Sequence, residues 1–194
     1  MNDLLFVVDK QSWHVGVDSP LLARHGRGDV DVAMKTADEL VWAARTNGVP
    51  VWWTQNIEGT IPVEWPLLPG EELTVDDPLY AIHGVGPEPG EVVLAKQFPA
   101  SMAADDPAWL HPAMVAADRI VVVGAFAGRC VLSTATNLVA GGKKVVFVED
   151  AVAAHPGSPA ELDVTVAVVR STLGWVESAA NVALTWKRDH VRRP

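Results

Sequence analysis

Apolar, β-branched runs alternate with helix-like segments along most of this chain. Buried strands are predicted at 4–8, 50–54, 91–95, 120–123 and 145–148. Helical spacing of apolar residues appears at 30–45, 131–140 and 159–173, with helical pieces broken by prolines over 100–117. Strands that alternate with helices predict an α/β fold: a doubly wound, Rossmann-like α/β/α sandwich around a mostly parallel sheet of about five or six strands.

Three stretches do not follow this alternation. Residues 14–28 read as a loop, and 55–90 form a long excursion that is rich in proline, glycine and acidic residues. The stretch 175–184 is expected to add a last strand before a short tail. Strands continue after the excursion, so we interpret 1–194 as one domain.

Composition narrows the classes of function. The formal net charge is −9 and no basic run is present, which argues against a nucleic-acid surface. No apolar run is long enough to span a membrane, and the N-terminus does not resemble a signal peptide. The single cysteine excludes an internal disulfide and fits a reducing cytoplasm.

That cysteine, Cys130, occupies an informative position. It lies in a turn between the strand at 120–123, which ends at Gly124, and the helix at 131–140. Ligands bind at this edge of open α/β sheets, and a helix N-terminus favours thiolate over thiol, so we expect a lowered pKa for Cys130. The alternative is a small residue of the hydrophobic core, as free cysteines often are.

Two further strands end in residues that complement a thiol. The strand at 4–8 runs into Asp9, and the strand at 91–95 runs into Lys96. The carboxyl ends of parallel strands share one edge of a sheet, so Asp9, Lys96 and Cys130 are expected to converge. A carboxylate takes the thiol proton, an ammonium stabilises both anions, and backbone N–H groups of the turn hold an oxyanion. Such a group suits attack on an amide-type carbonyl.

At these residues the chain resembles the isochorismatase-like cysteine hydrolases, a family that includes nicotinamidases, N-carbamoylsarcosine amidohydrolases and isochorismatases. The matching segments are VVDKQ with Asp9 and Gln11, VVLAKQFPASM with Lys96, VVVGAFAGRCVLSTATNLVAGG with Cys130, Thr134 and Ala135, and VFVEDAVAA with Asp150. These motifs follow the family's order over nearly the whole chain.

The resemblance implies a catalytic triad of Asp9, Lys96 and Cys130. It also implies an oxyanion hole from the backbone N–H groups of Phe126 and Cys130, a non-proline cis peptide at Ala125–Phe126, and a homo-oligomer such as a dimer or tetramer. Gln11, Trp13 and Phe126 are the candidate residues for binding a small-molecule substrate; Trp13 is chosen because the strand of Asp9 exits towards it.

The sequence departs from the family pattern in three places. Where the turn usually carries Thr or Ser and then Asp or Asn, this chain has Ala127 and Gly128. The segment TQNIEGT, at 54–60, lacks the metal-binding Asp and His of nicotinamidases, so no metal and no cofactor are expected. Pro99 stands where an aromatic residue is more common. No two of the six histidines have metal-ligand spacing, although His155 is conceivable as the partner in a Cys130–His155 dyad.

The leading hypothesis is therefore metal-independent hydrolysis of a small amide, ureido or carbamoyl compound. Cys130 is the nucleophile, Asp9 the general base and then acid, and Lys96 the electrostatic partner. Two alternatives stay open. One is hydrolysis of a vinyl ether such as isochorismate with Asp9 as the acid, and the other is a non-catalytic binding or scaffold protein that keeps the fold.

Overall fold

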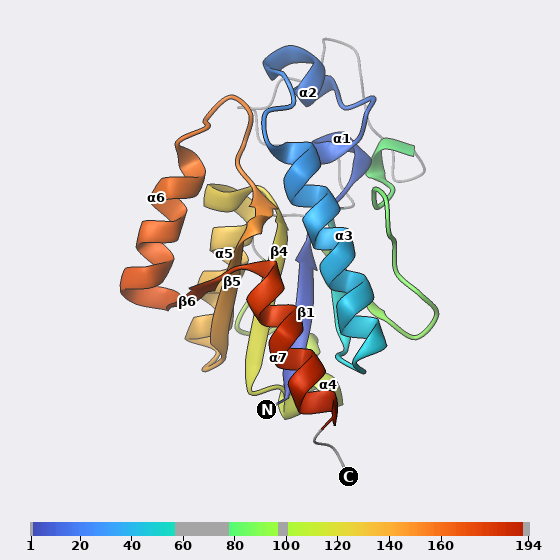
Figure 1. Ribbon diagram of the computed structural model, residues 1–194, viewed down its shortest axis with the longest axis vertical. Helices are drawn as coiled ribbons and strands as arrows, with labels where there is room; N and C mark the ends of the chain where they lie inside the picture. The colour runs from blue at the N-terminus through green and yellow to red at the C-terminus, as the bar shows by residue number, and fades with distance from the viewer. Residues whose placement is uncertain (1, 57–77, 97–100, 192–194) are drawn as a thin grey trace.

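A six-stranded parallel sheet organises the chain (Figure 1). The computed structural model describes residues 2–56, 78–96 and 101–191. The strands are β1 (Asp3–Val8), β2 (Val51–Asn56), β3 (Val92–Lys96), β4 (Arg119–Ala125), β5 (Lys144–Ala153) and β6 (Gly174–Glu177). Their spatial order, β3-β2-β1-β4-β5-β6, is that of a doubly wound sheet, which confirms the predicted fold class.

Helices cover both faces of this sheet. The longer ones are α3 (Val30–Thr46), α5 (Leu132–Ala140), α6 (Glu161–Val168) and α7 (Ala179–Val191), with the short α4 (Pro112–Ala116). Residues of α3 and α7 share one core cluster with one sheet face, while α4, α5 and α6 pack on the other (Figure 1). The helices expected at 30–45, 131–140 and 159–173 are thus present, the last continuing as a wider π-type turn at Val169–Leu173.

The alternation of side chains along the central strands explains the two faces. Phe6 of β1 belongs to the cluster under α5, and its neighbour Val7 belongs to the cluster under α3. Trp52 and Trp53 of β2 divide between the two clusters in the same way. Every residue from Leu4 to Val8 is fully buried, as expected for a parallel strand covered by helices on both sides.

The prediction of a loop over 14–28 was wrong. This stretch contains α2 (Pro20–His25) and the end of α1 (Ser12–Val15), and both helices lie beyond the carboxyl edge of the sheet (Figure 1). Proline at the first helical position and the Ser19 hydroxyl, which accepts the Leu22 N–H at 3.2 Å, start α2. Both helices are too short to show apolar periodicity in the sequence.

The C-terminal prediction also needs correction. After β6 the chain forms α7, thirteen residues long, where a short tail was expected. Only Ala179, Val182 and Trp186 of α7 are buried, so its apolar stripe is sparse. The Trp186 indole N–H donates to the Asp3 carboxylate at 2.7 Å, which fastens α7 to the first strand.

β5 extends five residues beyond the predicted end of its apolar run. Glu149 and Asp150 lie within the strand, and their side chains have partners outside the sheet. Asp150 accepts the Ala179 N–H at 2.8 Å, and Glu149 pairs with Arg170 at 3.1 Å. The strand then continues to Ala153 beside the end of β4.

Part of the 55–90 excursion is described. Residues 78–80 form a short 3₁₀ turn, and Ile82 makes an antiparallel bridge with Gln11. The proline-rich residues 57–77 lie outside the described part of the chain. The same holds for Pro99, since 97–100 is not described.

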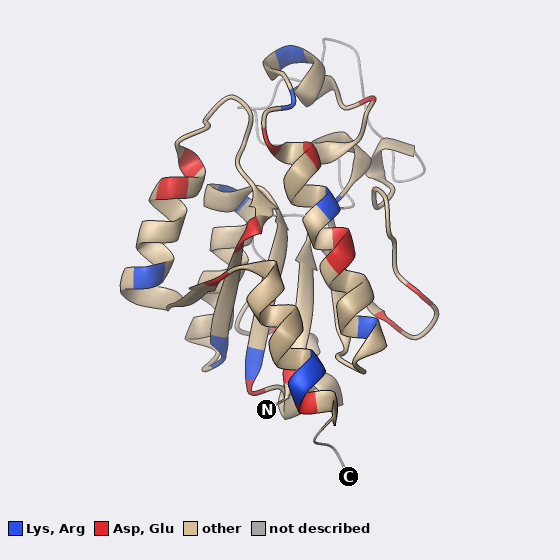
Figure 2. Cartoon of the chain, in the orientation of Figure 1, with Lys and Arg blue, Asp and Glu red and all other residues tan. Residues whose placement is uncertain are grey.

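Acidic and basic residues alternate along the elements coloured in Figure 2 and do not separate into one acidic and one basic region. Within residues 2–56, 78–96 and 101–191, no helix combines the length and apolarity needed to cross a bilayer.

Candidate active site

The site lies where the sheet changes winding direction. β1 and β4 are neighbours, and the chain leaves them towards β2 and towards β5 on opposite sides. In doubly wound sheets the crevice at this switch point, beyond the carboxyl ends of the strands, is the usual ligand site. Residues 9 and 126–130 emerge there.

Gly124 brings the two strand ends into close contact. It pairs with Val8 and has a φ of +119°, a conformation that suits glycine. A Cβ at this position would lie 2.0 Å from the Val8 carbonyl oxygen, so no larger residue fits. The sequence predicted that the strand ends at Gly124, whereas β4 continues past this residue. Gly124 allows the strand to continue to Ala125, which pairs with Ala153 of β5.

Asp9 is fully buried and sits in the left-handed region with a φ of +46°. Aspartate is one of the few residues that tolerate this conformation, which turns the chain sharply after β1. Thr54 of β2 holds both the backbone and the side chain of Asp9: its hydroxyl accepts the Asp9 N–H at 3.0 Å and donates to Asp9 Oδ1 at 2.6 Å. Sequence reasoning missed this role of Thr54, although it placed the residue at the end of a strand.

Lys96 reaches the same carboxylate from the last residue of β3. Its Nζ lies 2.6 Å from Asp9 Oδ2, and the two side chains are 6% and 0% exposed. The long lysine side chain spans the intervening strand β2 to make this contact. Asp9 thus has one oxygen directed to Thr54 and the other to Lys96.

Cys130 completes the cluster. It lies in a π-type turn, Ala127–Val131, that leads into α5, and the residue is half-buried. Its side chain is hydrogen-bonded with those of Asp9 and Lys96. The structure therefore brings together all three residues that the sequence placed at separate strand ends.

The predicted lowering of the Cys130 pKa was wrong in direction. Burial and the Asp9 carboxylate raise the pKa of Cys130 above the ordinary value, and these effects outweigh the opposing Lys96 ammonium. The resting site therefore holds a protonated thiol, with a carboxylate beside it that accepts a hydrogen bond.

The turn before Cys130 contains the expected cis peptide bond at Ala125–Phe126. The Phe126 ring is 2% exposed and packs edge-on between two histidine rings, with centroid distances of 5.7 Å to His14 and 5.2 Å to His155. The ring therefore supports the turn from inside the protein.

Both histidines are kept neutral at physiological pH. Burial lowers the pKa of His14 to about 4, and burial with the nearby charge of Arg129 lowers the pKa of His155 to about 4. His155 packs against Phe126 and His25, whereas the side chains bonded to the Cys130 thiol are Asp9 and Lys96. This arrangement favours the carboxylate over His155 as the base.

The other two candidate substrate-binding residues are buried. The Gln11 side chain accepts the Asn56 N–H at 2.8 Å and donates to the carbonyls of Asn56 at 2.9 Å and Tyr80 at 2.8 Å. Both amide hydrogens are thus used to join the end of β2 to the segment before β3. Trp13 is 7% exposed within α1.

Thr134 links the segments that carry Lys96 and Cys130. It is fully buried in α5, and its hydroxyl accepts the Ser101 N–H at 3.2 Å. The side-chain amide of Asn137, one turn later, donates to the Ser101 carbonyl at 2.9 Å. The chain that follows Lys96 is in this way held against the helix that follows Cys130.

Metal ligands do not gather in the described residues: no group of three or more His, Cys, Asp or Glu side chains there is arranged to hold an ion. The fold and the site together define an α/β protein in which a half-buried cysteine meets a buried aspartate–lysine pair at the switch point of the sheet.

Comparison with models of protein families shows which family the chain belongs to. The model of the Isochorismatase domain matches residues 3–180, so the chain belongs to the isochorismatase-like hydrolase family. Comparison with curated proteins found no match.

Solved structures share the fold. A cysteine hydrolase from Pseudomonas syringae pv. phaseolicola 1448A superposes with a TM-score of 0.77 at 20% identity, covering 96% of this chain and 93% of that one. N-carbamoylsarcosine amidase from Thermoplasma acidophilum gives 0.72 at 22% identity over 92% and 97% of the two chains. An isochorismatase family protein from Burkholderia thailandensis gives 0.71 at 25% identity over 96% of each.

Proposed function

We propose that this protein is a metal-independent cysteine hydrolase that cleaves the C–N bond of a small amide, ureido or carbamoyl compound through a thioester. The observation that carries the proposal is the position of the Asp9 carboxylate, 2.6 Å from the Lys96 ammonium and hydrogen-bonded to the protonated Cys130 thiol. The structural similarity to an N-carbamoylsarcosine amidase supports the choice of this substrate class.

The first half of the proposed reaction forms the thioester. Asp9 takes the thiol proton as the sulfur attacks the carbonyl carbon, and Lys96 balances the negative charge that moves between carboxylate and sulfur. The backbone N–H groups of Phe126 and Cys130 stabilise the oxyanion. When this intermediate collapses, Asp9 gives its proton to the leaving nitrogen, and ammonia or an amine departs.

The second half regenerates the enzyme. Asp9, again a carboxylate, takes a proton from water as the water oxygen attacks the thioester carbon. The C–S bond then breaks, the sulfur recovers a proton, and the acid product leaves. The net reaction adds one water across the C–N bond, and no oxidation or cofactor is involved.

Hydroxylamine trapping tests the thioester. Hydroxylamine present during turnover of an amide or carbamoyl substrate is expected to yield a hydroxamate, because a thioester reacts with any good nucleophile. Cys130→Ala is expected to abolish both the hydroxamate and the hydrolysis. Activity is expected to survive prolonged treatment with EDTA, since the segment 54–60 lacks a carboxylate–histidine ligand pair.

The two alternatives give different results in the same experiment. Vinyl-ether chemistry predicts isochorismate turnover that persists in Cys130→Ala and is lost in Asp9→Ala. A scaffold protein predicts no turnover of amide, carbamoyl or isochorismate substrates. Either outcome contradicts the proposal.

A further inference from the structure

Gly128, two residues before the nucleophile, lies directly against Glu161 of α6. A Cβ at position 128 would lie 2.6 Å from Glu161 Cγ and 3.0 Å from its Oε1. The backbone of Gly128 is not in the positive-φ region that requires glycine. The absence of a side chain at this position is therefore explained by space for Glu161.

Glu161 uses this space to bind the turn. The Gly128 N–H donates a short hydrogen bond to Glu161 Oε1. The second carboxylate oxygen, Oε2, lies 3.9 Å from Nε of Arg129, the residue immediately before Cys130. Arg129 has a non-helical backbone, with φ −120° and ψ −108°, at the point where the turn passes into the helix of Cys130.

The contacts of Glu161 with the turn are largely shielded from solvent. The Glu161 side chain is only 12% exposed, whereas that of Arg129 is 35% exposed. Glu161 is the first residue of α6, and Asp163, also in the first turn of this helix, is exposed. The turn itself offers no polar side chain at Ala127 or Gly128.

We propose that Glu161 is a positioning residue for the nucleophile. By holding the Gly128 N–H and the Arg129 guanidinium, it orients the backbone from which the Cys130 thiol and the Cys130 N–H project. A hydrogen bond to a carboxylate is stronger than one between neutral groups, so its loss leaves the turn free to rotate away from Asp9. This inference rests on the proposed role of Cys130 as the nucleophile.

Three variants separate this role from a general effect on α6. Glu161→Ala removes both contacts and is expected to lower kcat about 10- to 100-fold with little change in KM, the range that corresponds to losing one charge-assisted hydrogen bond. Glu161→Gln keeps an acceptor for Gly128 but not the charge facing Arg129, and an intermediate loss is expected. Asp163→Asn removes the same charge from the same helical turn, and kcat is expected to stay within about 2-fold of the wild type.

A second measurement needs no substrate. The rate at which iodoacetamide alkylates Cys130 at a fixed pH is expected to change in Glu161→Ala and not in Asp163→Asn. The midpoint temperature of thermal unfolding is expected to fall by a similar small amount in both variants. If hydrolysis is absent in the wild type but alkylation still separates the two variants, the proposed function fails and the positioning role stands. If Glu161→Ala matches Asp163→Asn in both measurements, or raises KM alone, the positioning role is overturned.

Discussion

Two consecutive residues, Asp9 and Lys10, each belong to a buried lysine–aspartate pair, and the pairs differ in what surrounds them. Asp9 meets Lys96 at 2.6 Å, and Lys10 meets Asp38 of α3 at 2.7 Å. The Lys96 and Lys10 side chains are 6% and 0% exposed. By the distance between the charged groups and the burial of the lysine, the two pairs look alike, although Asp38 is 24% exposed and Asp9 is 0% exposed.

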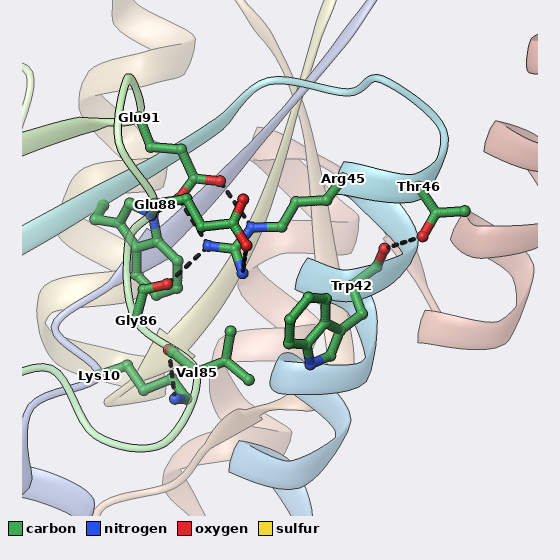
Figure 3. A network of polar contacts seen from close by, with 9 residues as sticks. Lys10, Trp42, Arg45, Thr46, Val85, Gly86, Glu88 and Glu91 are labelled. Atoms are coloured by element: carbon green, nitrogen blue, oxygen red, sulfur yellow. Dashed lines mark hydrogen bonds and ion pairs between the residues drawn. The ribbon is translucent and has the colours of Figure 1, made fainter.

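The hydrogen-bonding capacity of Lys10 is fully used by residues around it. Besides Asp38, the Lys10 ammonium donates to the carbonyl oxygens of His83 and Val85, so each of its three N–H bonds has an acceptor. Figure 3 shows the contact with Val85. The His83 N–H in turn donates to the Lys10 carbonyl at 2.7 Å. These contacts fasten the segment before β3 to α3, and their role is structural.

The Asp9 pair differs because a reactive group is added to it. The carboxylate accepts from Thr54 and Lys96 and still holds the Cys130 thiol. A buried ion pair is therefore weak evidence for a site by itself. The informative feature is a third, nucleophilic group whose proton the pair is placed to receive.

The largest contrast between the pairs is expected in activity. Lys96→Met removes the charge that balances Asp9 and the thiol, and kcat/KM is expected to fall about 10²- to 10³-fold, as when a preorganised electrostatic contact is lost. Lys10→Met is expected to leave kcat/KM per folded molecule within about 3-fold. Steady-state kinetics with active-site titration of Cys130 measure both, and equal losses would contradict the distinction.

Stability is expected to respond in the opposite way. Lys10→Met leaves the Asp38 carboxylate and two carbonyls without their donor, and the free energy of unfolding is expected to fall by about 3 kcal/mol, the lower end for a broken buried pair since Asp38 is 24% exposed. Urea unfolding followed by tryptophan fluorescence measures the change. A loss below about 1 kcal/mol would show that the Lys10 contacts contribute little.

The pH dependence of Cys130 alkylation distinguishes the two aspartates. Burial and Asp9 raise the pKa of Cys130, so the alkylation rate is expected to rise with an inflection above the ordinary thiol value of about 8.5. Asp9→Asn removes a negative charge and moves the inflection down, whereas Lys96→Met removes a positive charge and moves it up. Asp38→Asn is the matched control and is expected to leave it unchanged. An inflection below the ordinary value in the wild type would contradict the raised pKa.

Much of the fold follows from the sequence because parallel strands leave long apolar runs. The runs that became β1, β2, β3, β4 and β5 were all recognisable, and their order sufficed to place Asp9, Lys96 and Cys130 at one edge. The regions that were missed lack such a pattern. α2 depends on the Ser19 cap and Pro20, and α7 buries only three residues.

The sequence predicted the site less completely than the fold, because the details of the site depend on contacts between residues that are far apart in the chain. Thr54 binds Asp9 from 45 residues away and Glu161 binds Gly128 from 33 residues away, and neither lies in a motif. The direction of the Cys130 pKa shift was missed for a similar reason. A helix N-terminus is visible in the sequence, whereas burial and the distance to a carboxylate are properties of the packed structure.

The smallest expected effect concerns Arg45, which extends the structural side of the comparison (Figure 3). Its guanidinium binds both oxygens of Glu91 at 2.8 and 2.9 Å and the Gly86 carbonyl at 2.7 Å, and it lies 5.3 Å from the centre of the Trp42 ring. These contacts anchor the residue that precedes β3, whose other end carries Lys96. Arg45→Met is expected to lower the free energy of unfolding by about 1–2 kcal/mol, because Glu91 keeps its bond from the Trp53 indole at 2.7 Å.

Activity is expected to be unchanged in Arg45→Met, since five residues of extended strand place Lys96 about 17 Å from this anchor. Lys35→Met is the matched control: Lys35 and Glu39 are 79% and 67% exposed and 3.9 Å apart, so the loss is expected to stay below about 0.5 kcal/mol. Urea unfolding and kcat/KM are measured on both variants. If Arg45→Met lowers kcat/KM more than about 3-fold, the contacts of Arg45 influence the position of Lys96. The distinction between the structural Lys10 pair and the proposed catalytic Lys96 pair then does not hold along this strand. An unchanged kcat/KM with a measurable loss of stability would show that the contacts of Glu91, just before β3, affect stability alone. The residues that affect activity would then begin between Glu91 and Lys96, the last residue of β3.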